Sequence, residues 1–286
     1  MKSWERSFVH TSRGKFEVFM KGEGEPICVC HLYSEFDATG DIFADTFTDS
    51  HRVILVNLRE TGNSAQATEP YQLSMLETTF DLEAIRKAIG FDRWGFAGHS
   101  TGGMLGIVYA IYHSLSLSFL MVVGGAAREY MTFSPECIYH ADHPHFHQMQ
   151  ELNEKLKTSG ISIGERKSLS RLRTTYSLYD PGSYDQLFTR PTNKKMSALR
   201  MNYFSREIQL FDVTKKLPLI SAPTLIICGR HDVQCPLTYS VEMKEGIPGS
   251  KLVIFERSNH YPFLEEKAAF KEEVHAFLHN LNKADD

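Results

Sequence analysis

The chain has 286 residues, of which 42% are hydrophobic, and a formal net charge of −4. This length and apolar content suffice for one domain with a sizeable core and an inserted segment. Acidic and basic residues are mixed, so the basic surface typical of nucleic-acid binding is not expected. The N-terminal residues lack the apolar run of a signal peptide, and no stretch has the length of a membrane span. We therefore predict a cytoplasmic protein with no nucleic-acid or membrane partner.

Five cysteines agree with a reducing compartment, because their number is odd and they show no C-x-x-C spacing. Three of them, Cys28, Cys30 and Cys228, fall in apolar runs where cysteine packs as a small hydrophobic residue. The other two are Cys137 and Cys235. We expect no catalytic thiol among them.

Short apolar runs bounded by turn residues predict the strands. Residues 15–20 alternate between polar and apolar types, as in a half-exposed strand. The remaining runs are apolar throughout, which is typical of strands buried on both faces of a sheet. They cover residues 26–30, 53–57, 93–97, 223–228 and 251–255.

Segments with helical periodicity lie between most of these strands. The clearest covers residues 74–89, where Ser74 and Glu77 have the spacing of a capping box. Further helices are expected at residues 103–112 and 265–281. The alternation of strands and helices predicts an α/β fold, with a mostly parallel central sheet flanked by helices.

The pattern changes between residues 126 and 215, where strand-like runs are few and helical patterns occur at residues 149–157 and 199–210. Insertions above a rigid scaffold usually shape the pocket and select the substrate. We therefore predict a core of residues 1–125 and 216–286, and an inserted helical cap of residues 126–215. The alternative is a set of surface helices that do not contact the substrate.

The pentapeptide Gly98-His99-Ser100-Thr101-Gly102 lies between a predicted strand and a predicted helix. A G-x-S-x-G motif in this context is typical of a nucleophile elbow, where glycines flank the serine because side chains would collide with the neighbouring strand or helix. The turn exposes the hydroxyl and directs the helix N-terminus at the charge that forms when the serine attacks a carbonyl. Ser100 is therefore the candidate nucleophile.

A nucleophilic serine needs a histidine that accepts its proton and a carboxylate that orients the histidine. Asp232 follows the predicted strand at residues 223–228, and His260 follows the strand at residues 251–255. Both positions are at the carboxyl edge of a parallel sheet, in the order serine, acid, histidine. We predict Asp232 as the acid and His260 as the base. His231, next to the acid, is the competing candidate for the base.

The oxyanion formed during attack on a carbonyl needs two hydrogen-bond donors. One is expected to be the backbone amide of Thr101, because it follows the nucleophile. The other is expected in the loop after residues 26–30, where the amide of Tyr33 is the candidate. This machinery requires no cation, so we predict neither a metal nor a cofactor.

Four histidines lie close together in the predicted cap: His140, His143, His145 and His147. Their spacing matches neither the H-E-x-x-H motif nor a Cys/His finger, and Pro144 interrupts helical geometry. We therefore expect a surface or loop-packing cluster rather than a functional metal site.

Together, these motifs resemble the α/β-hydrolase superfamily over nearly the whole chain. They include residues 21–24 (KGEG), His31, residues 57–64 (NLRETGNS), residues 98–103 (GHSTGG), residues 229–232 (GRHD) and residues 258–263 (SNHYPF). Within the superfamily, the elbow and the stretches GRHDVQCP and SNHYPFLEE are most similar to the Bacillus-type proline iminopeptidases. The resemblance implies the α/β-hydrolase fold and a metal-free Ser-His-Asp enzyme that releases N-terminal proline from peptides through an acyl-enzyme.

Two departures from the family pattern bear on the substrate. The usual Asp-x-Arg-Gly-x-Gly pattern is replaced by Asn57, Arg59, Glu60 and Gly62. The usual His-Gly-Gly-Pro loop is replaced by residues 31–34 (HLYS). The hydrolase assignment survives both changes, but they weaken the peptidase specificity that the resemblance implies.

The substrate is predicted only as a small peptide or ester. An iminopeptidase must bind the charged imino group of proline, and the carboxylates placed to do so are Glu35, Glu129, Glu136 and Glu207. The alternative is a carboxylesterase or lactonase, for which an aromatic pocket without an inward carboxylate is expected. A non-catalytic binding protein is a third class, which the complete triad disfavours. Peptide and ester hydrolysis share the named machinery, so the sequence does not separate them, and it predicts no oligomeric state.

Overall fold

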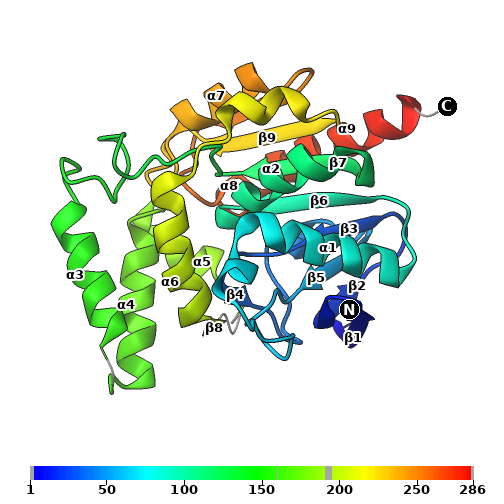
Figure 1. The fold of residues 1–286 in the computed structure, drawn as a ribbon. Helices are drawn as coiled ribbons and strands as arrows, with labels where there is room; N and C mark the ends of the chain where they lie inside the picture. Colours follow the sequence, from blue (N-terminus) through cyan, green and yellow to red (C-terminus); the bar gives the residue numbers. More distant parts are fainter. Residues whose placement is uncertain (1–2, 159, 191–194, 285–286) are drawn as a thin grey trace.

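The computed structural model describes residues 3–158, 160–190 and 195–284. Its centre is an eight-stranded sheet with the order β1-β2-β5-β3-β6-β7-β9-β10 (Figure 1). The pairs β1–β2 and β2–β5 are antiparallel, and all pairs from β5 to β10 are parallel, which confirms the predicted mostly parallel sheet. The strands are β1 (Glu5–Thr11), β2 (Gly14–Lys21), β3 (Pro26–Val29), β5 (Arg52–Val56), β6 (Trp94–His99), β7 (Leu117–Val123), β9 (Thr224–Gly229) and β10 (Lys251–Phe255).

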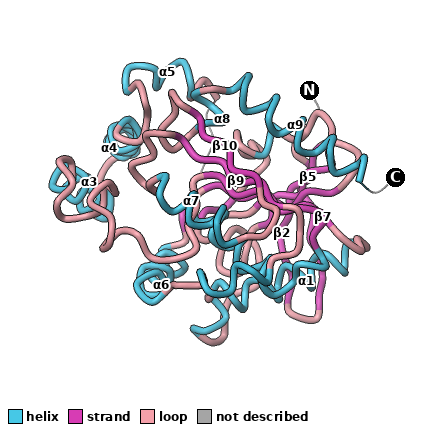
Figure 2. Tube along the Cα trace, turned by 90° about the horizontal axis from the view of Figure 1, so that it is seen from above, coloured by secondary structure: helices cyan, strands magenta, loops and turns pink. Residues whose placement is uncertain are grey.

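Helices cover both faces of the sheet, and each face buries its own hydrophobic cluster. One face packs against α1 (Met75–Ile89), α2 (Thr101–His113) and α7 (Leu237–Gly246). The other packs against α8 (Pro262–Glu265) and α9 (Lys267–Ala284). Figure 2 shows α1 and α9 on opposite sides of the strands.

The residues of β3 show why these strands are apolar throughout. Cys28 packs in the cluster under α2, whereas its neighbours Ile27 and Val29 pack in the cluster under α9. Successive side chains of a strand point to opposite faces, so a strand covered on both sides needs an apolar residue at every position.

The chain between β7 and β9 contains α3 (Phe146–Lys157), α4 (Ile163–Thr175), α5 (Tyr184–Leu187) and α6 (Ala198–Glu207). Figure 1 shows α3, α4 and α6 gathered at one end of the sheet. Within this stretch, β8 (Lys195–Met196) pairs with β4 (Ser34–Glu35), which lies in the loop after β3. We call residues 126–215 the inserted segment.

The predicted helices at residues 149–157 and 199–210 correspond to α3 and α6, the latter continued by a short 3₁₀ helix. The sequence did not predict α4, because none of its residues is buried and it has no apolar stripe. In the described part of the chain, no helix is long and apolar enough to cross a membrane. The 3₁₀ helices are η1 (Ala44–Thr46), η2 (Pro70–Leu73), η3 (Ser114–Ser116), η4 (Pro181–Ser183), η5 (Ile208–Leu210) and η6 (Thr214–Leu219).

Helix α1 starts where the sequence predicts, but its capping box is only half formed. Ser74 Oγ accepts a hydrogen bond from the amide of Glu77 at 3.1 Å. The Glu77 carboxylate instead accepts from Arg13 Nη2 at 2.6 Å. An ion pair with a residue distant in sequence therefore replaces the local contact.

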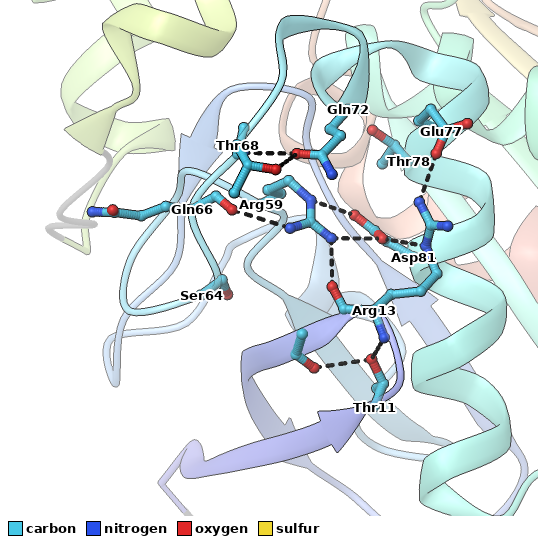
Figure 3. Close-up of polar contacts among 12 residues, drawn as sticks. Thr11, Arg13, Arg59, Ser64, Gln66, Thr68, Gln72, Glu77, Thr78 and Asp81 are labelled. Atoms are coloured by element: carbon cyan, nitrogen blue, oxygen red, sulfur yellow. Dashed lines mark hydrogen bonds and ion pairs between the residues drawn. The ribbon is translucent and has the colours of Figure 1, made fainter.

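A buried ion pair fixes the loop after β5 on α1 (Figure 3). Arg59 donates to both carboxylate oxygens of Asp81, at 3.1 and 3.0 Å, and to the carbonyls of Arg13 and Gln66, at 2.7 and 3.1 Å. Bidentate geometry and the additional carbonyl acceptors offset the cost of burying both charges. The stretch that departs from the family pattern at residues 57–62 is thus held firmly against the core.

A second buried polar cluster joins α1 to α2 around Glu83. Its carboxylate accepts from Arg86 at 2.9 and 2.7 Å, from the Tyr109 hydroxyl at 2.6 Å and from the Ser116 hydroxyl at 3.1 Å. Burial acts to raise the pKa of Glu83, but these donors favour the charged form and lower the pKa to about 2.

Glu83→Gln should destabilise the protein at neutral pH by about 2 kcal/mol, as expected for hydrogen bonds to a charged group. A carboxyl whose pKa is lowered by folding stabilises the native state above its unfolded pKa of about 4.3, and this contribution is lost as the pH falls toward 2. Urea denaturation of both proteins should therefore show a full difference at neutral pH that shrinks in acid. A difference in the free energy of unfolding that does not change with pH would contradict the lowered pKa of Glu83.

Candidate active site

Ser100 lies at a sharp turn between β6 and α2. Its backbone has φ 57° and ψ −123°, a strained conformation for a residue with a side chain. A Cβ on Gly98 would lie 2.2 Å from the Gly102 carbonyl oxygen, and a Cβ on Gly102 would lie 2.3 Å from that of Cys30. The structure thus has the strand-to-helix turn that the motif predicts, and its glycines are sterically required.

Asp232 and His260 lie side by side after β9 and β10. His260 Nδ1 is 2.8 Å from Asp232 Oδ2 and 3.1 Å from Oδ1, and the two residues are 2% and 4% exposed. Asp232 Oδ1 also accepts from the amides of Gln234 and Cys235, at 2.9 and 2.8 Å. The carboxylate therefore has the donors that a buried charge needs. Since Nδ1 faces this carboxylate, it carries the proton, and Nε2 is left as the acceptor.

Ser100 and His260 line the same cavity, which has a volume of about 380 Å³. Its walls come from the loops at the carboxyl edge of the sheet and from the inserted segment. Many of the lining side chains are aromatic, among them Tyr33, Phe43, Tyr139, Tyr184, Phe188 and Tyr261. The cavity can hold a small molecule next to the serine and the histidine.

His99, one of the two variable residues of the elbow motif, holds the loop that carries His260. Its Nε2 lies 2.8 Å from the His260 carbonyl oxygen, and the two rings are 4.6 Å apart. The amide of His260 donates to the carbonyl of Ser177, at 3.2 Å. Neither residue has a sequence signal for this role, since His99 occupies a position that the motif leaves open and Ser177 contacts His260 through its backbone.

Gly124, directly after β7, leaves room for the Asp232–His260 pair. It has φ 56°, and a Cβ there would lie 3.0 Å from Asp232 Oδ2 and 3.1 Å from His260 Nδ1. Both the backbone conformation and the space therefore require glycine. This role depends on contacts across the sheet and has no local sequence signal.

Arg200 of α6 anchors the loop after β3. Its Nε donates to the carbonyl of Leu32, and its other nitrogens donate to the Arg59 carbonyl at 3.0 Å and to Thr78 Oγ1 at 3.1 Å. The side chain is buried, and this burial lowers the pKa of Arg200 to about 10. The Leu32 carbonyl and the Tyr33 amide belong to one planar peptide unit, so this contact also sets the direction of the Tyr33 N–H.

Tyr33 and Thr101 are connected through His31. The amides of Tyr33 and Ser34 lie 3.4 and 3.2 Å from His31 Nδ1, and His31 Nε2 lies 3.2 Å from Thr101 Oγ1. At 3.4 Å, the contact between the Tyr33 amide and His31 Nδ1 is longer than a normal hydrogen bond, so this amide can donate to a stronger acceptor instead.

The four glutamates that were candidates for an inward carboxylate, all in the described part of the chain, are not among the residues that line this cavity. Glu35 accepts from the amide of Gly62 at 2.9 Å, and Glu207 accepts from the amide of Met75 at 2.9 Å. Glu129 is buried with its Oε1 on the amide of Thr132 at 2.8 Å, and Glu136 is exposed. Their positions along the chain gave no information on where these side chains point.

His231 and the four histidines of the histidine-rich loop also lie outside the cavity. His231 is exposed, and its ring contacts Tyr179 at 4.9 Å. In the histidine-rich loop, His140 Nδ1 and His143 Nδ1 each accept a backbone amide at 3.1 Å. Within the described ranges, no three or more His, Cys, Asp or Glu side chains are arranged to hold a metal ion.

Comparison with known proteins identifies the class. The profile of the alpha/beta hydrolase fold family matches residues 32–267, and the chain belongs to this family. A solved structure, an alpha/beta fold family hydrolase from Bacillus anthracis, is 42% identical, with a TM-score of 0.93 over 96% of this chain and 100% of that chain.

Two curated relatives are similar at lower identity. A proline iminopeptidase from Saccharolobus solfataricus is 28% identical over 69% of this chain and 66% of its own length, slightly under two thirds. A pimeloyl-[acyl-carrier protein] methyl ester esterase from Vibrio vulnificus is 23% identical over 90% of this chain and 95% of its own length. The relatives therefore include both a peptidase and an ester hydrolase.

Gly124→Ala should destabilise the protein more than Gly90→Ala. Both glycines have positive φ, so both variants incur backbone strain on the order of 1 kcal/mol. A Cβ at Gly90 meets no atom within 4 Å, whereas one at Gly124 crowds the Asp232–His260 pair. Urea denaturation measures the difference, and the His260 ring signals in NMR should shift only in Gly124→Ala. Equal losses with unchanged ring signals would show that the pair is not crowded.

Proposed function

We propose that this chain is a serine hydrolase in which Ser100 is the nucleophile, His260 the general base and Asp232 the residue that orients it. The observation that carries the proposal is the buried Asp232–His260 contact of 2.8 Å beside a cavity that His260 shares with Ser100. The strained elbow at Ser100 supports the same assignment, because backbone strain of this kind concentrates at functional sites.

In the proposed reaction, His260 Nε2 accepts the hydroxyl proton while Ser100 Oγ attacks the substrate carbonyl. Asp232 stays ionised and stabilises the imidazolium. The amides of Thr101 and Tyr33 donate to the oxyanion of the tetrahedral intermediate. The intermediate collapses to an acyl-enzyme as His260 returns the proton to the departing alcohol or amine. Water, deprotonated by His260, then attacks the acyl-enzyme, and the acid is released as His260 returns this proton to Ser100 Oγ.

In this proposal, residues 126–215 form a cap on a core of residues 1–125 and 216–286. The cap contributes lining residues from four of its helices: Met149, Arg173, Tyr184 and Met201. Arg200 connects the cap to the peptide unit that supplies one oxyanion donor, so its contacts favour the productive direction of the Tyr33 amide.

Small esters are the substrates that the cavity supports best. An enzyme that binds a charged N-terminus needs a carboxylate directed at the ammonium group, since an unpaired buried charge is costly. Among the described lining residues, Asp41 is the one carboxylate, and its Oδ1 accepts the amides of Phe43 and Ala44 at 2.9 and 3.1 Å. The aromatic walls suit an acyl chain or an alcohol group.

Release of N-terminal proline is the second candidate. It is supported by the similarity to the Saccharolobus proline iminopeptidase and by the Bacillus-type motifs at residues 98–103, 229–236 and 258–266. A proline ring would pack against the same aromatic walls.

Ser100→Ala should keep the fold and lose hydrolysis by a factor of about 10⁴ or more, because no other group can form the acyl-enzyme. The assay compares p-nitrophenyl butyrate with proline p-nitroanilide, and we expect the wild type to prefer the ester. A preference for the anilide would select the iminopeptidase. Residual activity above a few per cent of the wild type would refute the nucleophile.

Asp232→Asn should lower kcat by about 10⁴ with little change in KM, because the amide stabilises the wrong histidine tautomer. His260→Ala should be at least as damaging. His231→Ala is the matched control, since its ring is exposed and away from the cavity, and it should keep most of the activity. Loss of activity in His231→Ala alongside an active His260→Ala variant would reverse the choice of base.

A further inference from the structure

Arg173 of α4 is the one lysine or arginine among the described residues that line the cavity beside Ser100. Its side chain is half-buried. Within the described part of the chain, its guanidinium has neither a hydrogen bond nor an ion pair with a carboxylate. By contrast, Arg171 on the same helix is exposed and pairs with Asp185 at 2.5 and 2.6 Å. Arg173 thus lacks the carboxylate partner that Arg171 has.

The charge of this cation acts on three tyrosine hydroxyls. Burial raises the pKa of Tyr33, Tyr139 and Tyr261, while the charge of Arg173 acts in the opposite direction on each of them. The three hydroxyls are therefore protonated at neutral pH and lie within electrostatic range of the guanidinium, although that of Tyr139 already donates to Gln234 Oε1 at 3.1 Å. A cation together with phenolic donors favours an anionic acceptor.

The orientation of α4 agrees with a polar ligand. Ser170, Arg173 and Thr174 face the cavity, while the apolar Ile163 and Leu172 of the same helix are 90% and 48% exposed. Amphipathic helices normally turn their apolar stripe inward. This helix instead presents its polar side to the space that a substrate would fill.

No carboxylate lining the described part of the cavity neutralises Arg173. Asp41 is bound through Oδ1 to two backbone amides, and Asp232 lies behind His260 with both oxygens on the imidazole. An unpaired, partly buried cation is unfavourable. A ligand that brings its own negative charge would remove this cost, whereas a ligand with an ammonium group would add to it.

We propose that Arg173 selects small esters that carry a carboxylate, such as half-esters of short dicarboxylic acids. The guanidinium holds the free carboxylate in a bidentate contact while the ester carbonyl lies at Ser100 Oγ. This inference rests on the proposed ester hydrolase activity and names its substrate class. It also predicts that a free N-terminal amine is disfavoured.

The test compares mono-p-nitrophenyl glutarate with p-nitrophenyl pentanoate, two esters of equal chain length that differ in the terminal carboxylate. Arg173→Met should lower kcat/KM for the glutarate ester by about 10- to 100-fold, as expected for hydrogen bonds to a charged group. Its kcat/KM for the neutral ester should stay within about threefold of the wild type. Arg173→Lys should fall between the two, because it keeps the charge and loses the planar fork.

Lys167→Met is the matched control, because it removes an exposed positive charge from the same helix. It should leave both esters unaffected. Equal losses for the two esters in Arg173→Met would mean that Arg173 only supports the cap, and an unchanged preference would mean that it does not contact the substrate. Either result overturns the inference.

Calorimetric binding of glutarate and of neutral glutaramide to Ser100→Ala separates this inference from the proposed function. Glutarate should bind, glutaramide should not, and Arg173→Met should abolish the difference. If the wild type hydrolyses neither ester but glutarate binding still depends on Arg173, the anion site stands and the hydrolase proposal fails. If the neutral ester is hydrolysed and glutarate does not bind, the hydrolase proposal stands and this inference fails.

Discussion

The backbone turn at Ser100 is the constraint on which the candidate site depends. Its positive φ is held by close packing of Gly98 and Gly102 and by a hydrogen bond of 2.8 Å from the Ser100 amide to the carbonyl of Val123 at the end of β7. Since β6 lies between β3 and β7 in the sheet, the turn sits where the loops after the parallel strands meet. One local conformation therefore fixes which loops can reach the serine.

Backbone contacts, rather than side chain–side chain contacts alone, hold the surrounding groups. His99 binds the carbonyl of His260, Ser177 accepts its amide, and Arg200 binds the carbonyl of Leu32. Two of these three contacts come from the inserted segment. The geometry at the carboxyl edge of the sheet therefore depends on the segment that also lines the cavity, so changes there can affect both substrate binding and the positions of Tyr33 and His260.

The sequence predicts those features whose signals are local. Strand ends and the elbow motif place Ser100, Asp232 and His260, because parallel strands bring their carboxyl ends to one edge. The direction of a side chain has no local signal: Glu207 lies on α6 of the inserted segment, but its carboxylate binds the first turn of α1. Likewise, Arg13 displaces the predicted return contact of Glu77. The sequence of α4 has no apolar periodicity that would predict this helix or the position of Arg173, because the side of α4 with Ser170, Arg173 and Thr174 faces the cavity instead of the core.

Because Arg200 is buried, displacing α6 from the core costs more free energy than displacing α4, although both helices belong to the inserted segment. Moving α6 away from the core would break bonds to Leu32, Arg59 and Thr78, and each buried group left unpaired costs about 1–3 kcal/mol. Helix α4 has no buried residue to hold it. Displacing α4 from the core therefore costs less free energy than displacing α6, and α4 is the helix that carries Arg173, the cation of the cavity.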